Sequence, residues 1–283
     1  ITNIEEDHLI NYGNDFENLR QAFLSFVKKL PFDGLLIACG DDPEVQKLLP
    51  QCSRPNVTYG FDEINDYVIS NYEPTEFRSQ FLLTYASQSI HIDLNMLGRH
   101  NALNASAACV LAIEEGIDTS IIQVALKNFM GISRRMQVVG NMKIKNSNLI
   151  LIDDYGHHPS EIKNTIESIR ESHPKKKLTM VFQPHRYSRT KDLFEEFIEV
   201  LQLVDQLILL DVYPAGEDSI KNYESKDLLK KLKDTTLNVS LSEESTVNIA
   251  IEESLENHEG IILMQGAGNI SKISESLMKA YGN

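Results

Sequence analysis

Short apolar runs alternate with helical repeats in the second half of the chain. A wholly apolar run such as Leu149–Ile152 is typical of a parallel strand buried on both faces. Between such runs, apolar residues recur at helical spacing, as at Ile162, Ile166 and Ile169. From residue 136 onward the pattern therefore predicts a Rossmann-like, doubly wound α/β domain. Its strands are expected at Met136–Lys143, Leu149–Ile152, Leu178–Phe182, Leu207–Val212 and Ile261–Met264, and its helices near Ser160–Glu171, Lys191–Val204, Ser225–Lys233, Ser245–Asn257 and Asn269–Ala280.

The first half of the chain has a different pattern. Leu35–Cys39 is a short apolar run and predicts a buried strand, whereas Ile90–Met96 alternates strictly, as in an antiparallel strand with one solvated face. An alanine-rich helix is expected to follow Gly98. The first half is therefore expected to hold a mixed sheet with antiparallel strands. Residues 131–136 look like a domain junction, which divides the chain into residues 1–132 and residues 133–283.

Composition limits the class of protein. A chain of 283 residues, with 42% hydrophobic and 24% charged residues, is ordinary for a globular protein of two domains. A formal charge of −14 opposes binding to nucleic acid or to an anionic membrane, and no apolar run approaches the roughly 18 residues of a membrane helix. The three cysteines show no paired spacing, which favours a reducing compartment.

Polar clusters follow four of the predicted strands of the second domain. Loops after parallel strands emerge at one edge of a sheet, where ligands bind in open α/β folds. Arg186 and Arg189, with His185, form a local anion site on an otherwise acidic chain. Solvated turns have no need of this chemistry, so we expect a functional site. The four clusters are Asp153–His158, Gln183–Arg189, Asp211–Glu217 and Gln265–Asn269.

Two further sets of residues leave alternatives open. Asn101 and Asn104 are three apart near a helix start, so they share one face and could hold an adenine edge, but Asn101 could equally be a helix cap. Asp7 and His8 are metal-ligand types, but two adjacent groups do not make a site, and a structural role is favoured by the residues alone.

Taken together, these segments resemble the ATP-dependent Mur ligases, and within that family the members that add L-alanine to UDP-N-acetylmuramate. Each segment is weak evidence by itself, but in this order they are highly specific. The segments are Thr2–His8, Gly98–Ala105, Gly131–Met136, Asp153–Pro159, Phe182–Thr190, Asp211–Glu217 and Gln265–Ile270.

The resemblance implies an acid–amino-acid ligase of peptidoglycan synthesis in the bacterial cytoplasm, which uses ATP and Mg²⁺. In such enzymes ATP phosphorylates a substrate carboxylate, and the amine of the incoming amino acid attacks the acyl phosphate. The resemblance implies these roles by position: His8 as a magnesium ligand; His100, Asn101 and Asn104 as nucleotide contacts, the two asparagines at the adenine; Arg135 as a phosphate contact; Asp154 as the ribose acceptor; and Tyr155, His157, Arg186 and Arg189 as the catalytic grip on the amino acid and the acyl intermediate.

The chain also departs from the family pattern. The G-x-x-G-K-[ST] phosphate loop does not occur in it, and neither does the domain that holds the UDP-sugar in the family. We therefore expect residues 1–132 to be the C-terminal half of the central ATP-binding domain, with apolar surface exposed, and we expect this chain alone to be inactive. A tripeptide-adding recycling ligase of the same family, a non-catalytic nucleotide- or amino-acid-binding fragment and a nicotinamide dehydrogenase remain alternatives. The incomplete glycine fingerprint at residues 266–268 counts against the dehydrogenase.

Overall fold

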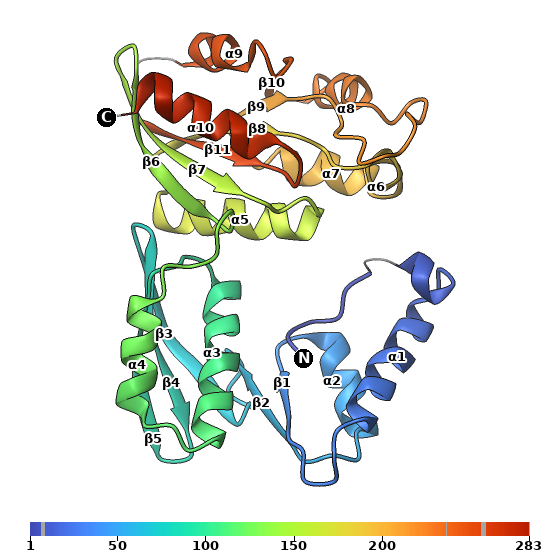
Figure 1. The fold of residues 1–283 in the computed structure, drawn as a ribbon, viewed down its shortest axis with the longest axis vertical. Helices are drawn as coiled ribbons and strands as arrows, with labels where there is room; N and C mark the ends of the chain where they lie inside the picture. The colour runs from blue at the N-terminus through green and yellow to red at the C-terminus, as the bar shows by residue number, and fades with distance from the viewer. Residues whose placement is uncertain (7–8, 236, 256–258, 283) are drawn as a thin grey trace. The chain divides into compact units, whose positions relative to one another are not determined.

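The computed structural model describes residues 1–6, 9–235, 237–255 and 259–282. The chain forms two compact units, Ile1–Met130 and Gly131–Asn283 (Figure 1). The boundary expected from the sequence, after residue 132, lies close to this division. Each unit has its own sheet and its own core, so each is described separately.

The first unit is built on a mixed sheet with strand order β1-β2-β3-β4-β5. β1, β2 and β3 are parallel neighbours, whereas β3, β4 and β5 form an antiparallel meander, which confirms the expected mixed sheet. The strands are β1 (Leu36–Cys39), β2 (Asn56–Gly60), β3 (Tyr67–Thr75), β4 (Arg78–Tyr85) and β5 (Gln88–Leu94). The helices are η1 (Leu9–Tyr12), α1 (Phe16–Lys28), α2 (Pro43–Leu48), η2 (Leu49–Gln51), α3 (Arg99–Glu114) and α4 (Thr119–Asn128).

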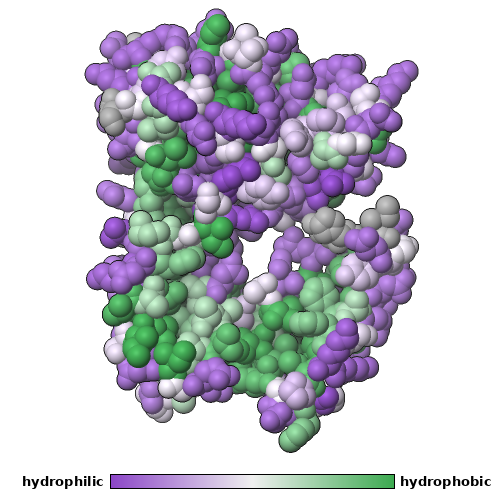
Figure 2. Space-filling model, viewed as in Figure 1, coloured by the Kyte–Doolittle hydropathy of each residue, from purple (hydrophilic) through white to green (hydrophobic). Residues whose placement is uncertain are grey.

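Helix α3 packs on this sheet, and α4 lies along β5. Apolar side chains of β3, β4 and β5 form one core cluster with Ala102, Cys109 and Val110 of α3. The opposite side of α4 is apolar and exposed, and Ile121 and Val124 are 60% and 59% accessible. Figure 2 shows hydrophobic surface over this part of the first unit.

The second unit contains a sheet with strand order β10-β9-β8-β11-β7-β6. All neighbouring pairs are parallel except β6 with β7, which are antiparallel. The sequence missed β10, and it extended the fourth expected strand to Val212, whereas β9 ends at Leu209. The strands are β6 (Gln137–Ile144), β7 (Ser147–Asp154), β8 (Lys177–Phe182), β9 (Gln206–Leu209), β10 (Asn238–Leu241) and β11 (Gly260–Gln265).

Helices cover both faces of this sheet, with α9 and α10 over one face and α5 and α7 over the other (Figure 1). This arrangement confirms the doubly wound fold. The single helix expected at Lys191–Val204 is instead two, because the chain is interrupted at Leu193. The helices are α5 (Pro159–Ser172), α6 (Tyr187–Asp192), α7 (Phe194–Leu201), α8 (Ser225–Leu232), α9 (Val247–Ser254) and α10 (Ile270–Tyr281). Within the described ranges, no helix combines the length and the apolar character that a membrane span requires.

Candidate functional site

The carboxyl ends of four parallel strands meet at one edge of the second sheet. β7, β11, β8 and β9 are neighbours that run in the same direction, so the loops that follow them emerge side by side. The four polar clusters expected from the sequence lie on these loops. Their meeting at one edge is therefore confirmed, and their side chains form the candidate site.

Four aromatic and imidazole rings form a row along this edge. The ring of Tyr155 meets that of His157 edge-on with the centroids 5.3 Å apart, and His157 lies 5.4 Å from His185. His185 in turn stacks on Tyr213 at 5.5 Å, with 9° between the planes. The backbone supports this stack, because the Tyr213 N–H donates to the carbonyl of Pro184 at 2.8 Å. The row thus joins the loops after β7, β8 and β9.

His185 is neutral at physiological pH. Burial is the main cause that lowers its pKa to about 4, and the charges of His157, Arg189 and Arg186 act in the same direction, against that of Glu217. Its Nδ1 atom is buried and has no hydrogen-bond partner among the residues that the structure describes. His185 therefore lies near the charges of both arginines, but it does not add a positive charge to the expected anion site.

Glu217 orders the loop that carries Arg186. Its carboxylate accepts hydrogen bonds from the backbone N–H of Ser188 at 3.0 Å and from the Ser188 hydroxyl at 2.7 Å, and it lies 3.5 Å from the Arg186 guanidinium. Burial alone would raise the pKa of Glu217, but these bonds and the charge of Arg186 outweigh it, so the pKa is lowered. The Arg186 side chain nevertheless remains 50% exposed. It can therefore reach an anionic ligand at this edge.

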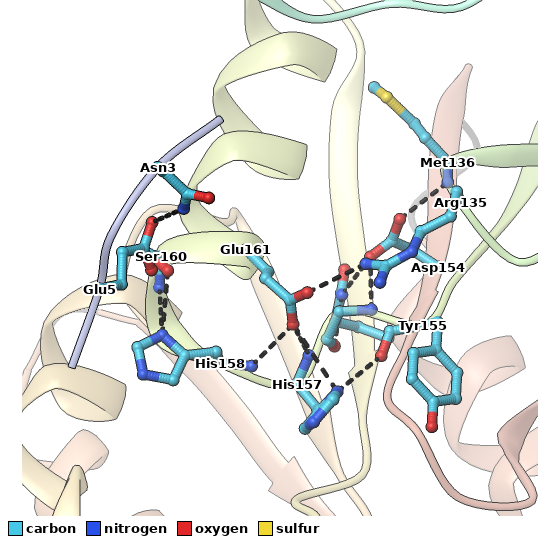
Figure 3. Close-up of polar contacts among 12 residues, drawn as sticks. Asn3, Glu5, Arg135, Met136, Asp154, Tyr155, His157, His158, Ser160 and Glu161 are labelled. Carbon is cyan, nitrogen blue, oxygen red and sulfur yellow. Dashed lines mark hydrogen bonds and ion pairs between the residues drawn. The ribbon is translucent and has the colours of Figure 1, made fainter. Parts of the chain in front are cut away.

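Asp154 lies at the centre of a hydrogen-bond network at the end of β7. Its carboxylate accepts from the N–H of Met136 at 2.7 Å, the N–H of Gly156 at 2.8 Å and the Gln265 amide at 2.6 Å. Figure 3 shows the contact with Met136. Asp154 is only 4% exposed. Through its bond with Met136 it connects the start of β6 to the end of β7. The role of Asp154 at a ribose, implied by the family resemblance, stays a prediction.

Arg135 is held by the first turn of α5. Its guanidinium lies 3.0 Å from one oxygen of Glu161, whose other oxygen accepts from the N–H groups of His157 and His158 (Figure 3). Glu161 and His158 also form the capping box that begins α5 at Pro159. Arg135 is 45% exposed, so a phosphate could compete for it, but this role also stays a prediction.

Arg134 is more deeply anchored than Arg135, although no separate role was expected for it. One nitrogen donates to the carbonyl of Gly266 at 2.7 Å, and Nε lies 3.6 Å from the buried carboxylate of Asp153. Burial raises the pKa of Asp153, and the charge of Arg134 opposes that rise. The guanidinium also lies 4.9 Å from the centre of the Tyr155 ring. A carboxylate at the end of a wholly apolar strand was the available signal, because a buried carboxylate needs a cation.

The proposed nucleotide residues of the first unit lie at the start of α3. Asn101 is 8% exposed, and its amide donates to the carbonyl of Leu97 at 2.7 Å. The alternative that Asn101 caps the helix is wrong, because the N-cap of α3 is Gly98 and no side chain makes a capping bond there. Asn104, one turn later, is exposed, and His100 is half-buried. Nucleotide binding by these three residues stays a prediction.

The expected magnesium ligand cannot be placed. His8 lies outside the described residues, so its role is untested. In the rest of the chain, as far as it is described, no group of three or more His, Cys, Asp or Glu side chains could hold a metal ion. We therefore assign no metal ligand from the geometry.

Two family models match the chain, one in each unit. Residues 1–112 match the Mur ligase middle domain, and residues 134–268 match the Mur ligase, glutamate ligase domain. Among solved structures, the UDP-N-acetylmuramate-alanine ligase MurC of Thermotoga maritima is 27% identical, with a TM-score of 0.77 over 99% of this chain and 58% of that one.

Two more distant structures share the fold. A murein peptide ligase of Psychrobacter arcticus is 18% identical, with a TM-score of 0.64 over 100% of this chain and 57% of its own. The MurF ligase of Thermotoga maritima in complex with ADP is 15% identical, with a TM-score of 0.71 over 98% of this chain and 60% of its own. The chain thus spans less than two thirds of the length of the structures it matches. Because consecutive Mur ligase domains match both of its units, the chain belongs to the Mur ligase family.

Proposed function

We propose that this chain is part of an ATP-dependent ligase that joins L-alanine to UDP-N-acetylmuramate in peptidoglycan precursor synthesis. The proposal rests above all on the likeness to the alanine ligase of Thermotoga maritima, which extends over 99% of this chain. The site adds chemical support, because Arg186 and Arg189 lie beside the row of rings at one sheet edge. An amino acid carries a carboxylate, and an acyl phosphate carries further negative charge, so paired arginines suit both.

In the proposed reaction, the carboxylate of UDP-N-acetylmuramate takes the γ-phosphoryl group of ATP, which gives an acyl phosphate and ADP. The alanine amine, having lost a proton, attacks the acyl carbon; a C–N bond forms, and the C–O bond to phosphate breaks. The chain's own contribution is to position the reactants and to neutralise charge. We propose that Arg186 and Arg189 hold the anionic groups and that Tyr155 and His157 border the amino acid.

We further propose that His100, Asn101 and Asn104 bind the nucleotide, with the asparagines at adenine, and that Arg135 and Asp154 bind phosphate and ribose. The exposure of Asn104 and Arg135 supports their part in this. Asp154 would have to accept hydroxyl groups in addition to its three present donors. Mg²⁺ would lower the negative charge of the phosphates, and we propose His8 as one of its ligands.

We also propose that the protein works in the bacterial cytoplasm. This location supplies ATP and the nucleotide-linked sugar together. The three cysteines support a reducing compartment, because all are free thiols and Cys39 and Cys109 are buried.

The test is ADP release with ATP, Mg²⁺, UDP-N-acetylmuramate and L-alanine. This chain should be compared with a longer version of the protein that restores the upstream sequence, and we expect turnover only in the longer version. Glycine, serine and the tripeptide should replace alanine in parallel reactions. A preference for the tripeptide would favour the recycling ligase, and no turnover with any acceptor would refute the proposal.

A pair of arginine variants tests the site. Arg186→Gln in the longer protein should raise the KM for the acceptors, because it removes an exposed positive charge from the site. Arg170→Gln is the matched control: Arg170 pairs with Asp205 at 2.9 Å and bonds the backbone before β8, at the other end of the strands. Equal losses in both variants would contradict the assigned role of Arg186.

A further inference from the structure

Three side chains from three separate loops close a hydrogen-bonded triangle behind the row of rings. The amide of Gln183, after β8, donates to Glu244 at 3.0 Å and to the Asn269 side-chain oxygen at 2.9 Å. The amide of Asn269, after β11, donates to the other oxygen of Glu244 at 2.8 Å. Glu244 lies after β10, a strand that the sequence did not predict. The loop after β10 therefore joins the edge that carries the site.

Gln183 connects this triangle to the interior of the second unit. It is 2% exposed, and its backbone N–H donates to the carbonyl of Gln265 at 3.0 Å. Its side-chain oxygen packs against Gly268, where an added Cβ would lie only 2.3 Å from that oxygen. The same Cβ would lie 2.9 Å from the ring of Tyr213. Gln183, Gly268 and Tyr213 thus fit together with no room for another atom.

The triangle is connected to the row of rings along the chain and by packing contacts. His185 follows Gln183 by one intervening residue, so the backbone fixed at Gln183 determines where the imidazole begins. Tyr213 packs against Gly268, and its ring stacks on the ring of His185 with the planes 9° apart. Movement of Gln183 or Gly268 would therefore disturb the stack.

We propose that Glu244 is a positioning residue of the ligase site, which holds the His185–Tyr213 stack in place through Gln183 and Asn269. The inference deepens the proposed function and rests on it for its catalytic meaning. Glu244 does not touch the row of rings in any described contact, so it is assigned no catalytic part.

A carboxylate suits this position for a chemical reason. Both neighbours present amide N–H groups, and a carboxylate accepts one with each oxygen, whereas a glutamine would have to turn a donor toward one of them. Bonds to a charged acceptor are also stronger than bonds between neutral groups. Glu244 is itself exposed, so its charge stays solvated while it orders the buried Gln183.

The first experiment needs no catalysis and uses this chain. The imidazole signals of His185 are recorded by NMR in the wild type, in Glu244→Ala and in Glu243→Ala. Glu243 is the matched control, because it is the neighbouring exposed glutamate and its side chain bonds only Ser245 in the described contacts. We expect Glu244→Ala to shift the His185 signals through a changed ring current from Tyr213, and Glu243→Ala to leave them in place. The proposal would be overturned if the His185 signals of Glu244→Ala stayed at their wild-type positions, or if Glu243→Ala shifted them by the same amount.

A double variant tests whether Glu244 acts through Gln183. Gln183→Ala should shift the same His185 signals, and Gln183→Ala/Glu244→Ala should add little to either single change, because one connection is lost in all three. Fully additive shifts would contradict the route through Gln183. Circular dichroism of each variant verifies that the fold is retained.

The second experiment uses the longer protein and separates positioning from general damage. Glu244→Ala should raise the KM for alanine by roughly 5–30-fold, the effect of one or two kcal/mol, with the KM for ATP unchanged. Glu244→Gln, which keeps one acceptor oxygen, should lie between Glu244→Ala and the wild type. Equal changes in both KM values would overturn the positioning role. If the wild type has no ligase activity, the proposed function fails, and the NMR comparison alone decides whether Glu244 holds the stack.

Discussion

The low pKa of His185 makes a prediction that can be tested in isolation. The group has an ordinary pKa of 6.5, which the fold lowers to about 4, mainly by burial and then by His157, Arg189 and Arg186. Because the unfolded chain binds the proton more readily, a fall in pH favours unfolding. The loss of folding stability due to His185 is absent well above pH 6.5, grows as the pH falls, and is complete below about pH 4.

The size of the effect follows from this shift. At pH 5 the full shift would correspond to ~2 kcal/mol of lost stability. The ring is only partly buried, so solvent screening reduces the expected loss to ~1 kcal/mol. His185→Gln removes the titration, so the wild type should lose ~1 kcal/mol more than the variant between pH 8 and pH 5.

Urea unfolding at both pH values measures this difference. The amide NMR signals of β8 are used as the probe, so that only unfolding of the second unit is observed. The other carboxylates and histidines titrate in both proteins and cancel in the comparison. A direct titration of the His185 ring carbons should give a midpoint near 4. A midpoint near 6.5, or equal pH dependence in the two proteins, would refute the reasoning that burial and neighbouring cations keep this ring neutral.

Three further predictions concern single contacts. Asp154→Asn turns an amide toward one of the three donors that the carboxylate accepts, so urea unfolding should show a loss of ~1–3 kcal/mol from the second unit. Asn101→Ala should cost the first unit ~1–2 kcal/mol in the same assay, because it leaves a buried carbonyl unpaired, whereas exposed Asn104→Ala should leave stability unchanged and weaken only nucleotide binding by calorimetry with the longer protein. Gly268→Ala should cost ~1–3 kcal/mol in thermal unfolding, because its Cβ would lie 2.3 Å from the side-chain oxygen of Gln183; an unchanged melting temperature would mean that this fit is loose.

The buried strands and the edge that carries the site could be predicted because the relevant signals are local. An apolar run such as Leu149–Ile152 gives both the strand and its burial, and polar residues directly after it mark where the strand ends. β10 lacks such a signal. It is an edge strand with mostly exposed side chains, so it has neither an apolar run nor an alternating pattern of burial.

The unpredicted parts of the site depend on contacts between distant segments. Arg134 and Arg135 are adjacent and chemically alike, yet one bonds a carbonyl more than a hundred residues later and the other pairs with α5. The neutrality of His185 likewise depends on its burial and on neighbouring charges that include His157. Glu244 could not be singled out from Glu243, because only the fold directs one of them toward Gln183. Residue type and spacing carry none of this information.

The distribution of charge is compatible with the proposed anion site on an acidic chain. The chain has a formal charge of −14, and Asp154, Glu161 and Glu217 are three of the carboxylates that lie at or beside this sheet edge. Each of them bonds backbone N–H groups: Asp154 at Met136 and Gly156, Glu161 at His157 and His158, and Glu217 at Ser188. Their charge is therefore directed at amide dipoles, where it orders the loops and is partly neutralised.

The arginines at this edge are placed differently. Arg134 lies beside the Asp153 carboxylate and donates to the carbonyl of Gly266. Arg186, in contrast, lies 3.5 Å from Glu217, and half of its side chain remains exposed. An incoming carboxylate or phosphate would thus meet a solvated guanidinium before it met a carboxylate. Because Glu217 holds the loop that carries Arg186, neutralising it as Glu217→Gln should loosen that loop and weaken the proposed anion binding, even though the change removes a negative charge. Simple electrostatics would predict the opposite sign, so the affinity of Glu217→Gln for an anionic acceptor decides between the two accounts.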